Sequence, residues 1–458
     1  MENFWDFSVW GNIHLFAFLL GSLLLANALK RAFPVLQASL IPTSVLGGAI
    51  MLLVAGVYKL AVGEDLFNTA FFAGHGMAML ETITYHTLAL GFIASSLKTS
   101  DEKMTKQRSV EIFNTGVTTV STYLLQAILG FAITLVAAML VKGFFPAAGV
   151  LLPFGYGQGP GQAMNYGGIY EMEYGFEGGK SFGLTIAALG FISAAFGGVI
   201  HLNILKRKRK IVLGSGENVN YDTEELQLEN EIPMQGSMDK LTVQVALVFL
   251  AYFLAYLLML VLGMILPGMR AVIYGFNFLL GVIAATLVKT GLVFLEKKVA
   301  RRRYINNFLL TRISNFFFDI MVVASIAAIR LGILQKYWGI ILMLGVCGLV
   351  FTYIYNYYVA KTLFPAYQEE QFLTMFGMLT GTASTGVVLL REIDGKFKTP
   401  AAENLVYQNF PAMVFGFPIL LLATMAPNKP YLTLAIVVVF FIAMNLLLLR
   451  SLIFRKKK

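Results

Sequence analysis

The stretch Leu151-Leu-Pro-Phe-Gly-Tyr-Gly-Gln-Gly-Pro-Gly-Gln-Ala-Met-Asn-Tyr-Gly-Gly-Ile-Tyr-Glu171 lies between two long apolar segments of the chain. Its glycines and Pro160 disfavour a regular membrane-spanning helix. Its amide side chains, Gln158, Gln162 and Asn165, are costly in hydrocarbon unless a partner satisfies them. Broken backbone at membrane depth is tolerated only where protein buries it or where it lines a water-filled cavity. The stretch therefore predicts a re-entrant hairpin, residues 151–171, that lines a polar site.

Composition places the whole chain in a membrane. The 458 residues are 57% hydrophobic and only 13% charged, whereas soluble domains carry about 25% charged residues. The net charge of +10 does not indicate nucleic-acid binding, because the basic residues form short clusters at the ends of apolar runs. Cys347 is the only cysteine, so an intrachain disulfide is excluded. The acidic N-terminus lacks the basic region of a cleaved signal peptide.

Apolar runs long enough to span a bilayer recur along the chain. They predict helices at residues 9–29, 41–60, 79–97, 112–141, 181–205, 240–266, 271–295, 312–330, 337–361, 401–425 and 430–453. Most of the 35 lysines and arginines fall on one side of the membrane when the N-terminus is placed outside. The positive-inside rule therefore predicts a multi-pass protein of the cell (inner) membrane with an external N-terminus and a cytoplasmic C-terminus.

A second broken segment, residues 374–392, falls in the corresponding place of the second half. Each half then has four spans, a hairpin and a fifth span, and the second half starts from the inside. This order predicts an all-α polytopic membrane protein with a 5+5 inverted-topology repeat, two re-entrant hairpins and one extra C-terminal helix. The expected parts are a first repeat at 1–205, a cytoplasmic linker at 206–239, a second repeat at 240–426, and the extra span with a basic tail at 427–458. Inverted repeats with interrupted segments are typical of secondary transporters.

Three patches of sequence carry a resemblance to a known family. They are Gly159-Pro-Gly-Gln-Ala-Met-Asn-Tyr-Gly-Gly-Ile-Tyr-Glu-Met-Glu-Tyr-Gly-Phe176, Gly381-Thr-Ala-Ser-Thr-Gly386 and Leu40-Ile-Pro-Thr-Ser-Val-Leu-Gly-Gly48. The first two resemble the hairpin signatures, and the third the second-span opening, of the bacterial sodium/glutamate symporter family. The resemblance implies a homodimer, sodium coupling, a mobile hairpin-bearing domain and a fold distantly like that of the 2-hydroxycarboxylate transporters. The chain departs from the family at Tyr156-Gly-Gln158-Gly, at Ser384 and in its extra helix.

Oxygen-bearing side chains in the second half of the chain are candidate sodium ligands. Sodium in transporters is coordinated by backbone carbonyls, hydroxyls and amides. The candidates are Thr380, Thr382, Asp319 and Asn409. A carboxylate as deep in a span as Asp319 is functional by default, although a structural pairing with a neighbouring Asn or with Lys289 explains it equally well. Sodium is expected only as the coupling ion. No other cofactor and no metal site are expected, because the histidines show no metal-ligand spacing.

The substrate site is expected between the two hairpin tips. An anionic carboxylate suits the N-terminal end of a half-helix, where free N–H groups converge. The candidate substrate-binding residues are Gln158, Gln162, Asn165, Ser384, Thr385 and Arg391. Two simpler explanations stay open. Small residues at the tips also allow close helix packing, and Arg391 also fits a solvent-exposed pairing with Glu392 and Asp394.

These patterns favour sodium-coupled symport of glutamate or a similar small carboxylate by alternating access. A proton-coupled carrier of another organic anion is the nearest alternative. A membrane-embedded transferase is less favoured, since the chain lacks His-Glu-x-x-His and paired acidic ligands, and the protein is not expected to be an enzyme. The expected partners are a small carboxylate, sodium, the lipid bilayer and a second copy of the chain, but no nucleic acid.

Overall fold

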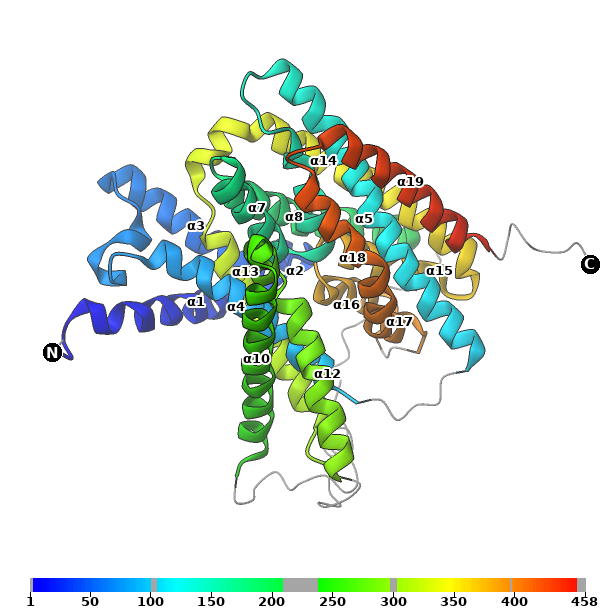
Figure 1. Cartoon of the computed structure of the whole chain (residues 1–458), viewed down its shortest axis with the longest axis horizontal. Coiled ribbons are helices and arrows are strands. Elements are labelled where there is room, and N and C mark those ends of the chain that lie inside the picture. Colours follow the sequence, from blue (N-terminus) through cyan, green and yellow to red (C-terminus); the bar gives the residue numbers. More distant parts are fainter. Residues whose placement is uncertain (1–2, 100–104, 209–237, 297–302, 396–397, 451–458) are drawn as a thin grey trace, which may run out of the picture. The chain divides into compact units, whose positions relative to one another are not determined.

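The computed structural model describes residues 3–99, 105–208, 238–296, 303–395 and 398–450. Helices dominate these residues, which contain no β-strand (Figure 1). Ten helices are long and apolar enough to cross a membrane, and one bent pair adds an eleventh candidate by the same criteria, counted over the described residues alone. The expected all-α polytopic class is therefore confirmed.

The ten long helices follow the predicted apolar runs closely. They are α1 (Phe7–Ala32), α3 (Thr43–Val62), α4 (Gly76–Leu97), α5 (Lys106–Leu140), α8 (Gly179–Arg207), α10 (Lys240–Ile265), α12 (Asn277–Leu295), α13 (Asn307–Ala327), α14 (Leu331–Leu363) and α19 (Pro430–Leu448). The bent pair is α17 (Ala401–Tyr407) with α18 (Asn409–Met425). Shorter connecting elements include α2 (Pro34–Ala38), η1 (Leu66–Asn68), η2 (Ala70–Phe72), η5 (Pro267–Met269) and α11 (Arg270–Gly275).

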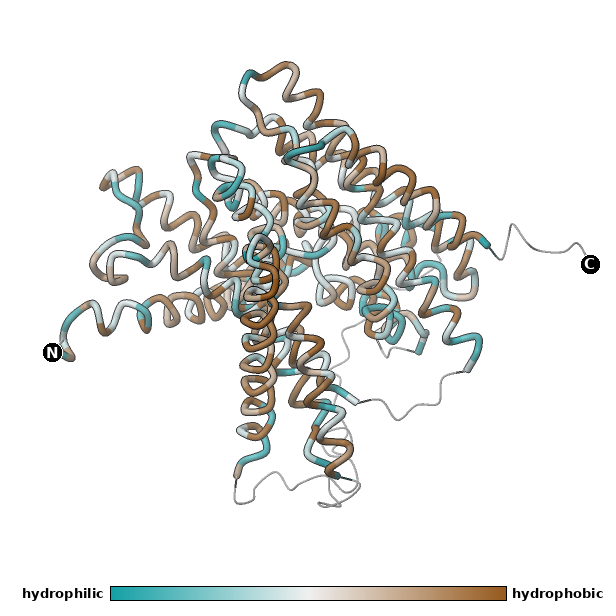
Figure 2. Tube along the Cα trace, in the orientation of Figure 1, coloured by the Kyte–Doolittle hydropathy of each residue, from teal (hydrophilic) through white to brown (hydrophobic). Residues whose placement is uncertain are grey.

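The surface of the long helices is apolar. Figure 2 shows hydrophobic colours along most of each long helix, with hydrophilic colours at helix ends and in connections. Large apolar side chains stand exposed on them, including Leu60 at 90% and Leu140 at 80% of their accessible surface. Contiguous apolar surface of this extent marks contact with a membrane rather than with water. The helices therefore belong in a lipid bilayer.

Two predicted spans differ from the observed helices. The run 271–295 is divided at Phe276 into α11 and α12. The run 401–425 bends by 49° between α17 and α18, because Pro411 has no N–H to bond to Tyr407 O and so the first helix ends there. Residues 209–237 of the predicted linker at 206–239, and residues 451–458 of the basic tail, lie outside the described residues.

The helices form two compact units, and each is described by itself. The first contains α4, α10 and α12, together with the start of α1 and most of α13. Its core joins Ile93 of α4, Ala251 of α10 and Leu310 of α13. Lys289 of α12 donates to the carbonyls of Ser96 and Lys98, at 2.7 and 3.1 Å, and so caps the end of α4.

The second unit contains α3, α5, α8, α14 and α17–α19, together with both Gly-rich segments. Within it α5 packs against α14, α18 and α19. One core of this unit is formed by Val117, Val359, Ile419 and Val437, one from each of these four helices. The site described below lies wholly within this unit.

Both Gly-rich segments are broken helices. The first runs through η3 (Pro146–Val150), α6 (Leu151–Pro153), the π-helical turn η4 (Phe154–Gln158) and α7 (Pro160–Tyr174). The second runs through η7 (Pro365–Tyr367), α15 (Gln368–Thr380) and α16 (Ala383–Arg391). The sequence thus located both interruptions, although α15 begins six residues earlier than the expected 374.

Candidate functional site

The breaks of the two segments lie side by side. Gly159 ends the first half of its segment with φ of +88°, a left-handed conformation that favours glycine. A Cβ placed on Gly159 would lie 3.7 Å from Thr382 Cγ2 and 4.0 Å from the carbonyl oxygen of Gly381. We call this place the junction, defined by residues 157–162 and 379–385. It brings together parts of the chain that are more than 200 residues apart.

Two helices begin at the junction, α7 directly after Gly159 and α16 directly after Thr382. Neither start is capped by a side chain of the preceding residue. The N–H groups of a first helical turn have no partner within the helix, and the helix dipole adds positive potential at the same end. Two such ends in one place favour an anionic ligand.

Two side chains of α5 contact both broken segments. The hydroxyl of Tyr123 donates to Gly157 O at 3.0 Å, and Gln126 Nε2 donates to Leu379 O at 2.9 Å. Gly157 has to be glycine here, because a Cβ would overlap the ring of Tyr123. Behind the junction, Gly190 of α8 leaves room for the carbonyl of Thr380. The ends of both first halves are therefore fixed by α5 and α8.

Gln162 is the most distinctive of the predicted substrate residues. It lies in the first turn of α7 with only 1% of its surface exposed. Its Oε1 accepts from Asn165 Nδ2 at 3.5 Å, whereas its Nε2 has no hydrogen-bond partner among the residues that the structure describes. A buried donor without a partner is rare in native proteins and calls for an explanation. The explanation we favour is a ligand that accepts from it.

The threonines and the serine at the break of the second segment differ in their exposure to solvent. Thr380 and Thr385 are fully buried, Thr382 is half-buried and Ser384 is exposed. Thr380 donates to Phe376 O at 2.6 Å, and the hydroxyls of Thr382 and Thr385 lie 3.4 Å apart. In the first segment Gln158 is half-buried at the end of η4. These residues, together with Gln162, belong to the junction.

Three predicted site residues lie elsewhere. Arg391 is exposed at the far end of α16, and Asn409 is exposed at the α17–α18 bend, where it accepts from Gln408. Asp319 is an exposed residue of α13 and belongs to the first unit. The suggestion that Asp394 lies in plain solvent is wrong, since it is 8% exposed and held by the backbone of its own loop.

Sequence reasoning missed the contribution of α5. Its polar residues Thr115, Thr119, Thr122 and Gln126 recur at helical spacing along one face of a candidate membrane span. Thr119 donates to Gln408 Oε1 at 2.8 Å, which connects α5 to the α17–α18 bend. That polar stripe within a membrane span was the available signal, because polar residues inside spans usually face the protein interior.

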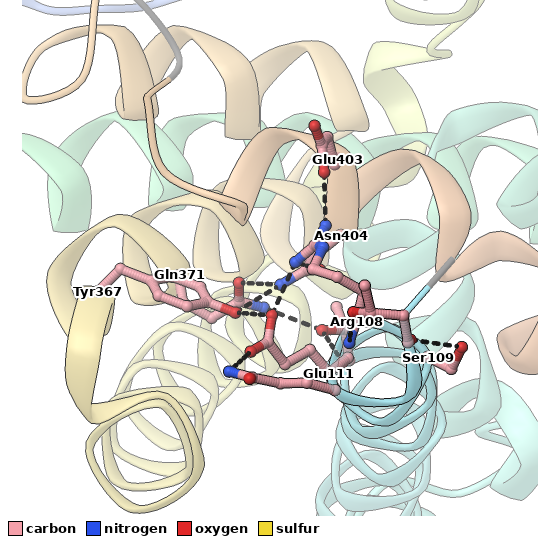
Figure 3. A network of polar contacts seen from close by, with 10 residues as sticks. Arg108, Ser109, Glu111, Tyr367, Gln371, Glu403 and Asn404 are labelled. Carbon is pink, nitrogen blue, oxygen red and sulfur yellow. Dashed lines mark hydrogen bonds and ion pairs between the residues drawn. The ribbon is translucent and has the colours of Figure 1, made fainter. Parts of the chain in front are cut away.

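A network of charged and polar groups fastens the start of α15 to α5 and α17 (Figure 3). Arg108 binds Glu111 at 2.7 Å and Glu403 at 2.6 Å. The hydroxyl of Tyr367 donates to Glu111 at 2.9 Å, and Asn404 Nδ2 donates to that hydroxyl at 3.0 Å. Arg108 thus bridges Glu111 and Glu403, and the network holds the start of α15 against α5 and α17.

Tyrosines fasten the second half of the first segment to α18. The hydroxyls of Tyr166 and Tyr170 donate to the carbonyls of Leu420 and Ala423, at 2.8 and 2.7 Å. Both tyrosines are fully buried. Because they are four residues apart, they lie on one face of α7. The helix that carries Gln162 is therefore held against α18.

Comparison with known proteins does not assign this arrangement to a family. No family model matches the sequence, and no curated protein matches it either.

Proposed function

We propose that the chain is a secondary active transporter that carries glutamate or a similar small carboxylate together with sodium, with its site at the junction. The observation that carries this proposal has two parts: two helix N-termini lie together at the junction, and the first turn of one of them holds a buried donor without a partner, Gln162 Nε2. A carboxylate has the charge for the helix ends and the lone pairs for the amide. Half-helices that begin at a binding site are a recurring device of secondary transporters.

Sodium coupling is supported by the other two helix ends at the same place. The turn η4 ends at Gln158 and α15 ends at Thr380, and carbonyl oxygens gather at such C-terminal ends. The hydroxyls of Thr380, Thr382 and Thr385 add further oxygen atoms. Hard monovalent cations bind sets of neutral oxygens of this kind.

The order of elements supports alternating access. In the first half α5 precedes its broken segment and α8 follows it, and in the second half α14 and α18 take these places. All of these elements belong to the second unit. This correspondence supports a structural repeat. That the repeat is inverted, that both segments are re-entrant and that the N-terminus is external remain part of the proposal, on the charge bias of the sequence. We also propose that the chain forms a homodimer, which the resemblance of the three sequence patches implies.

The proposal is tested with purified protein in proteoliposomes. A panel of radiolabelled carboxylates, with glutamate first, is offered with an inward sodium gradient and with choline in place of sodium at fixed pH. We expect uptake of at least one small carboxylate that disappears in choline. Uptake that persists in choline and follows a pH gradient would instead support the proton-coupled alternative. No uptake of any carboxylate would contradict the proposal.

A further inference from the structure

Two buried amides lie where α5 packs against α14, beside the junction. Gln126 is 0% exposed and Asn356 is 1% exposed. Both donate to one residue of α14: Gln126 Nε2 to Thr352 Oγ1 at 3.0 Å, and Asn356 Nδ2 to Thr352 O at 2.9 Å. The two side chains therefore occupy one neighbourhood around Thr352.

The oxygen atom of each amide is unpaired. Neither Gln126 Oε1 nor Asn356 Oδ1 has a hydrogen-bond partner within the described part of the chain. The amide orientations are fixed, because each nitrogen donates to two oxygens: Gln126 also to Leu379 O at 2.9 Å, and Asn356 also to Thr122 Oγ1 at 3.4 Å. Turning either amide over would set oxygen against oxygen. A buried acceptor without a donor is destabilising.

Both unpaired atoms are acceptors, so the missing partner carries positive charge or a proton donor. The neighbouring groups are neutral amide, hydroxyl and carbonyl oxygens. Over the described residues no group of three or more His, Cys, Asp or Glu is placed to hold a metal ion, which disfavours a transition metal. Neutral oxygens in a buried place suit a hard monovalent cation. We propose that Gln126 and Asn356, with Thr352 between them, form a sodium site.

This site connects the ion to both broken segments. Gln126 holds the carbonyl of Leu379, two residues before the break at Gly381. Its Oε1 lies 3.2 Å from the position that a Cβ on Gly157 would take. A cation on Oε1 fixes the side chain that touches the two segments at once. The inference rests on the proposed function and deepens it, because it gives a coupling ion a place apart from the hydroxyls of Thr380 and Thr382.

The test measures sodium binding without transport. The unfolding temperature of the purified full-length protein is followed in detergent as sodium chloride replaces choline chloride at constant ionic strength, with no carboxylate present. A ligand that binds only the native state raises that temperature in a saturable way. We expect this rise in the wild type. In Asn356→Ala and Gln126→Leu, half-saturation should require at least tenfold more sodium.

Asn445→Ala is the matched control. This half-buried amide also contacts α14, but both of its polar atoms have a partner: its Oδ1 accepts from the hydroxyl of Tyr355 at 2.8 Å and its Nδ2 donates to Phe441 O at 2.8 Å. The control should lose stability yet keep the wild-type sodium response. If Asn356→Ala does not fold, Gln126→Leu alone decides. A wild type that sodium does not stabilise, or variants with an unchanged sodium response, would overturn the site.

The failure of this site and the failure of the proposed function are distinguishable. Stabilisation by sodium that depends on Asn356, in a protein that takes up no carboxylate, would support the site and overturn the transport assignment. Sodium-driven uptake with unchanged sodium dependence in Asn356→Ala and Gln126→Leu would overturn the site alone.

Discussion

A role of Gln162 in binding a ligand and a role in packing predict different effects when the side chain is replaced. Its Nε2 is buried without a protein partner, so in the protein alone this donor is a cost. Leucine at this position would remove that cost and would lose only the long 3.5 Å contact from Asn165 Nδ2. Gln371 is the opposite case. It is equally buried, but its Nε2 donates to Thr115 at 3.2 Å and its Oε1 accepts from Asn404 at 3.1 Å.

We therefore expect Gln162→Leu to raise the KM for the carboxylate at least tenfold without lowering the unfolding temperature. Gln371→Leu should lower the free energy of unfolding by about 1–3 kcal/mol and leave KM near the wild-type value. Uptake kinetics and thermal unfolding of both variants check the pair. A destabilised Gln162→Leu with unchanged KM would show that this amide is structural.

Asp394 gives a prediction about pH. Its carboxylate accepts from the N–H groups of Lys398 and Thr399, both at 2.8 Å, and from the Thr399 hydroxyl at 2.7 Å. Burial by itself raises the pKa of Asp394, but these hydrogen bonds outweigh it and hold the pKa below its ordinary value. A lowered folded-state pKa contributes stability above the unfolded-state value, near 3.9. That contribution is lost as the pH falls through the folded-state pKa.

Asp394→Asn should accordingly unfold at a lower temperature than the wild type at neutral pH, and the difference should shrink as the pH falls below about 4. Thermal unfolding of both proteins across this pH range is the measurement. A difference that stays constant with pH would mean that the charge of Asp394 contributes nothing.

At the scale of elements, the attachment of α7 to α18 can be tested most directly. Tyr166 and Tyr170 each donate a buried hydrogen bond to a carbonyl of α18, whereas Tyr174 only approaches Thr424 O at 3.5 Å. Each buried bond contributes about 1 kcal/mol. The double variant Tyr166→Phe/Tyr170→Phe should lose about 2 kcal/mol of unfolding free energy, and Tyr174→Phe almost none. Equal losses in all three positions would contradict this account of how α7 is held.

The elements also show what a sequence reveals and what it hides. The breaks at Gly159 and Gly381 were predictable, because glycine and proline act on the local backbone. The contacts of Gln126 were not, since a long apolar helix such as α5 gives no local sign of which segment will pack on its polar stripe. The bend between α17 and α18 has a local cause in Pro411, but a hydropathy profile alone shows one continuous apolar run there.

For the whole molecule, the proposed coupling has an electrical consequence. One cation moving through about 100 mV gains about 2.3 kcal/mol, and a roughly tenfold sodium gradient adds about 1.4 kcal/mol. A monoanionic substrate that moves with one sodium cancels the voltage contribution and reaches only about tenfold accumulation. Steep accumulation of an acidic substrate therefore requires at least two sodium ions.

We accordingly expect uptake to increase when a potassium gradient with valinomycin makes the vesicle interior negative. The measurement compares steady-state accumulation at imposed potentials. Steep accumulation that does not respond to the membrane potential would contradict a stoichiometry of two or more.

The central claim is that the junction of the two broken segments is the transport site. The most direct test is sodium-driven carboxylate uptake by the variant in which Thr382, Ser384 and Thr385 are all replaced by alanine. Thr382 and Thr385 lie at the start of α16 with their hydroxyls 3.4 Å apart. The account predicts a folded, membrane-inserted protein with no sodium-dependent uptake. Sodium-dependent uptake at the wild-type rate in that variant would contradict it.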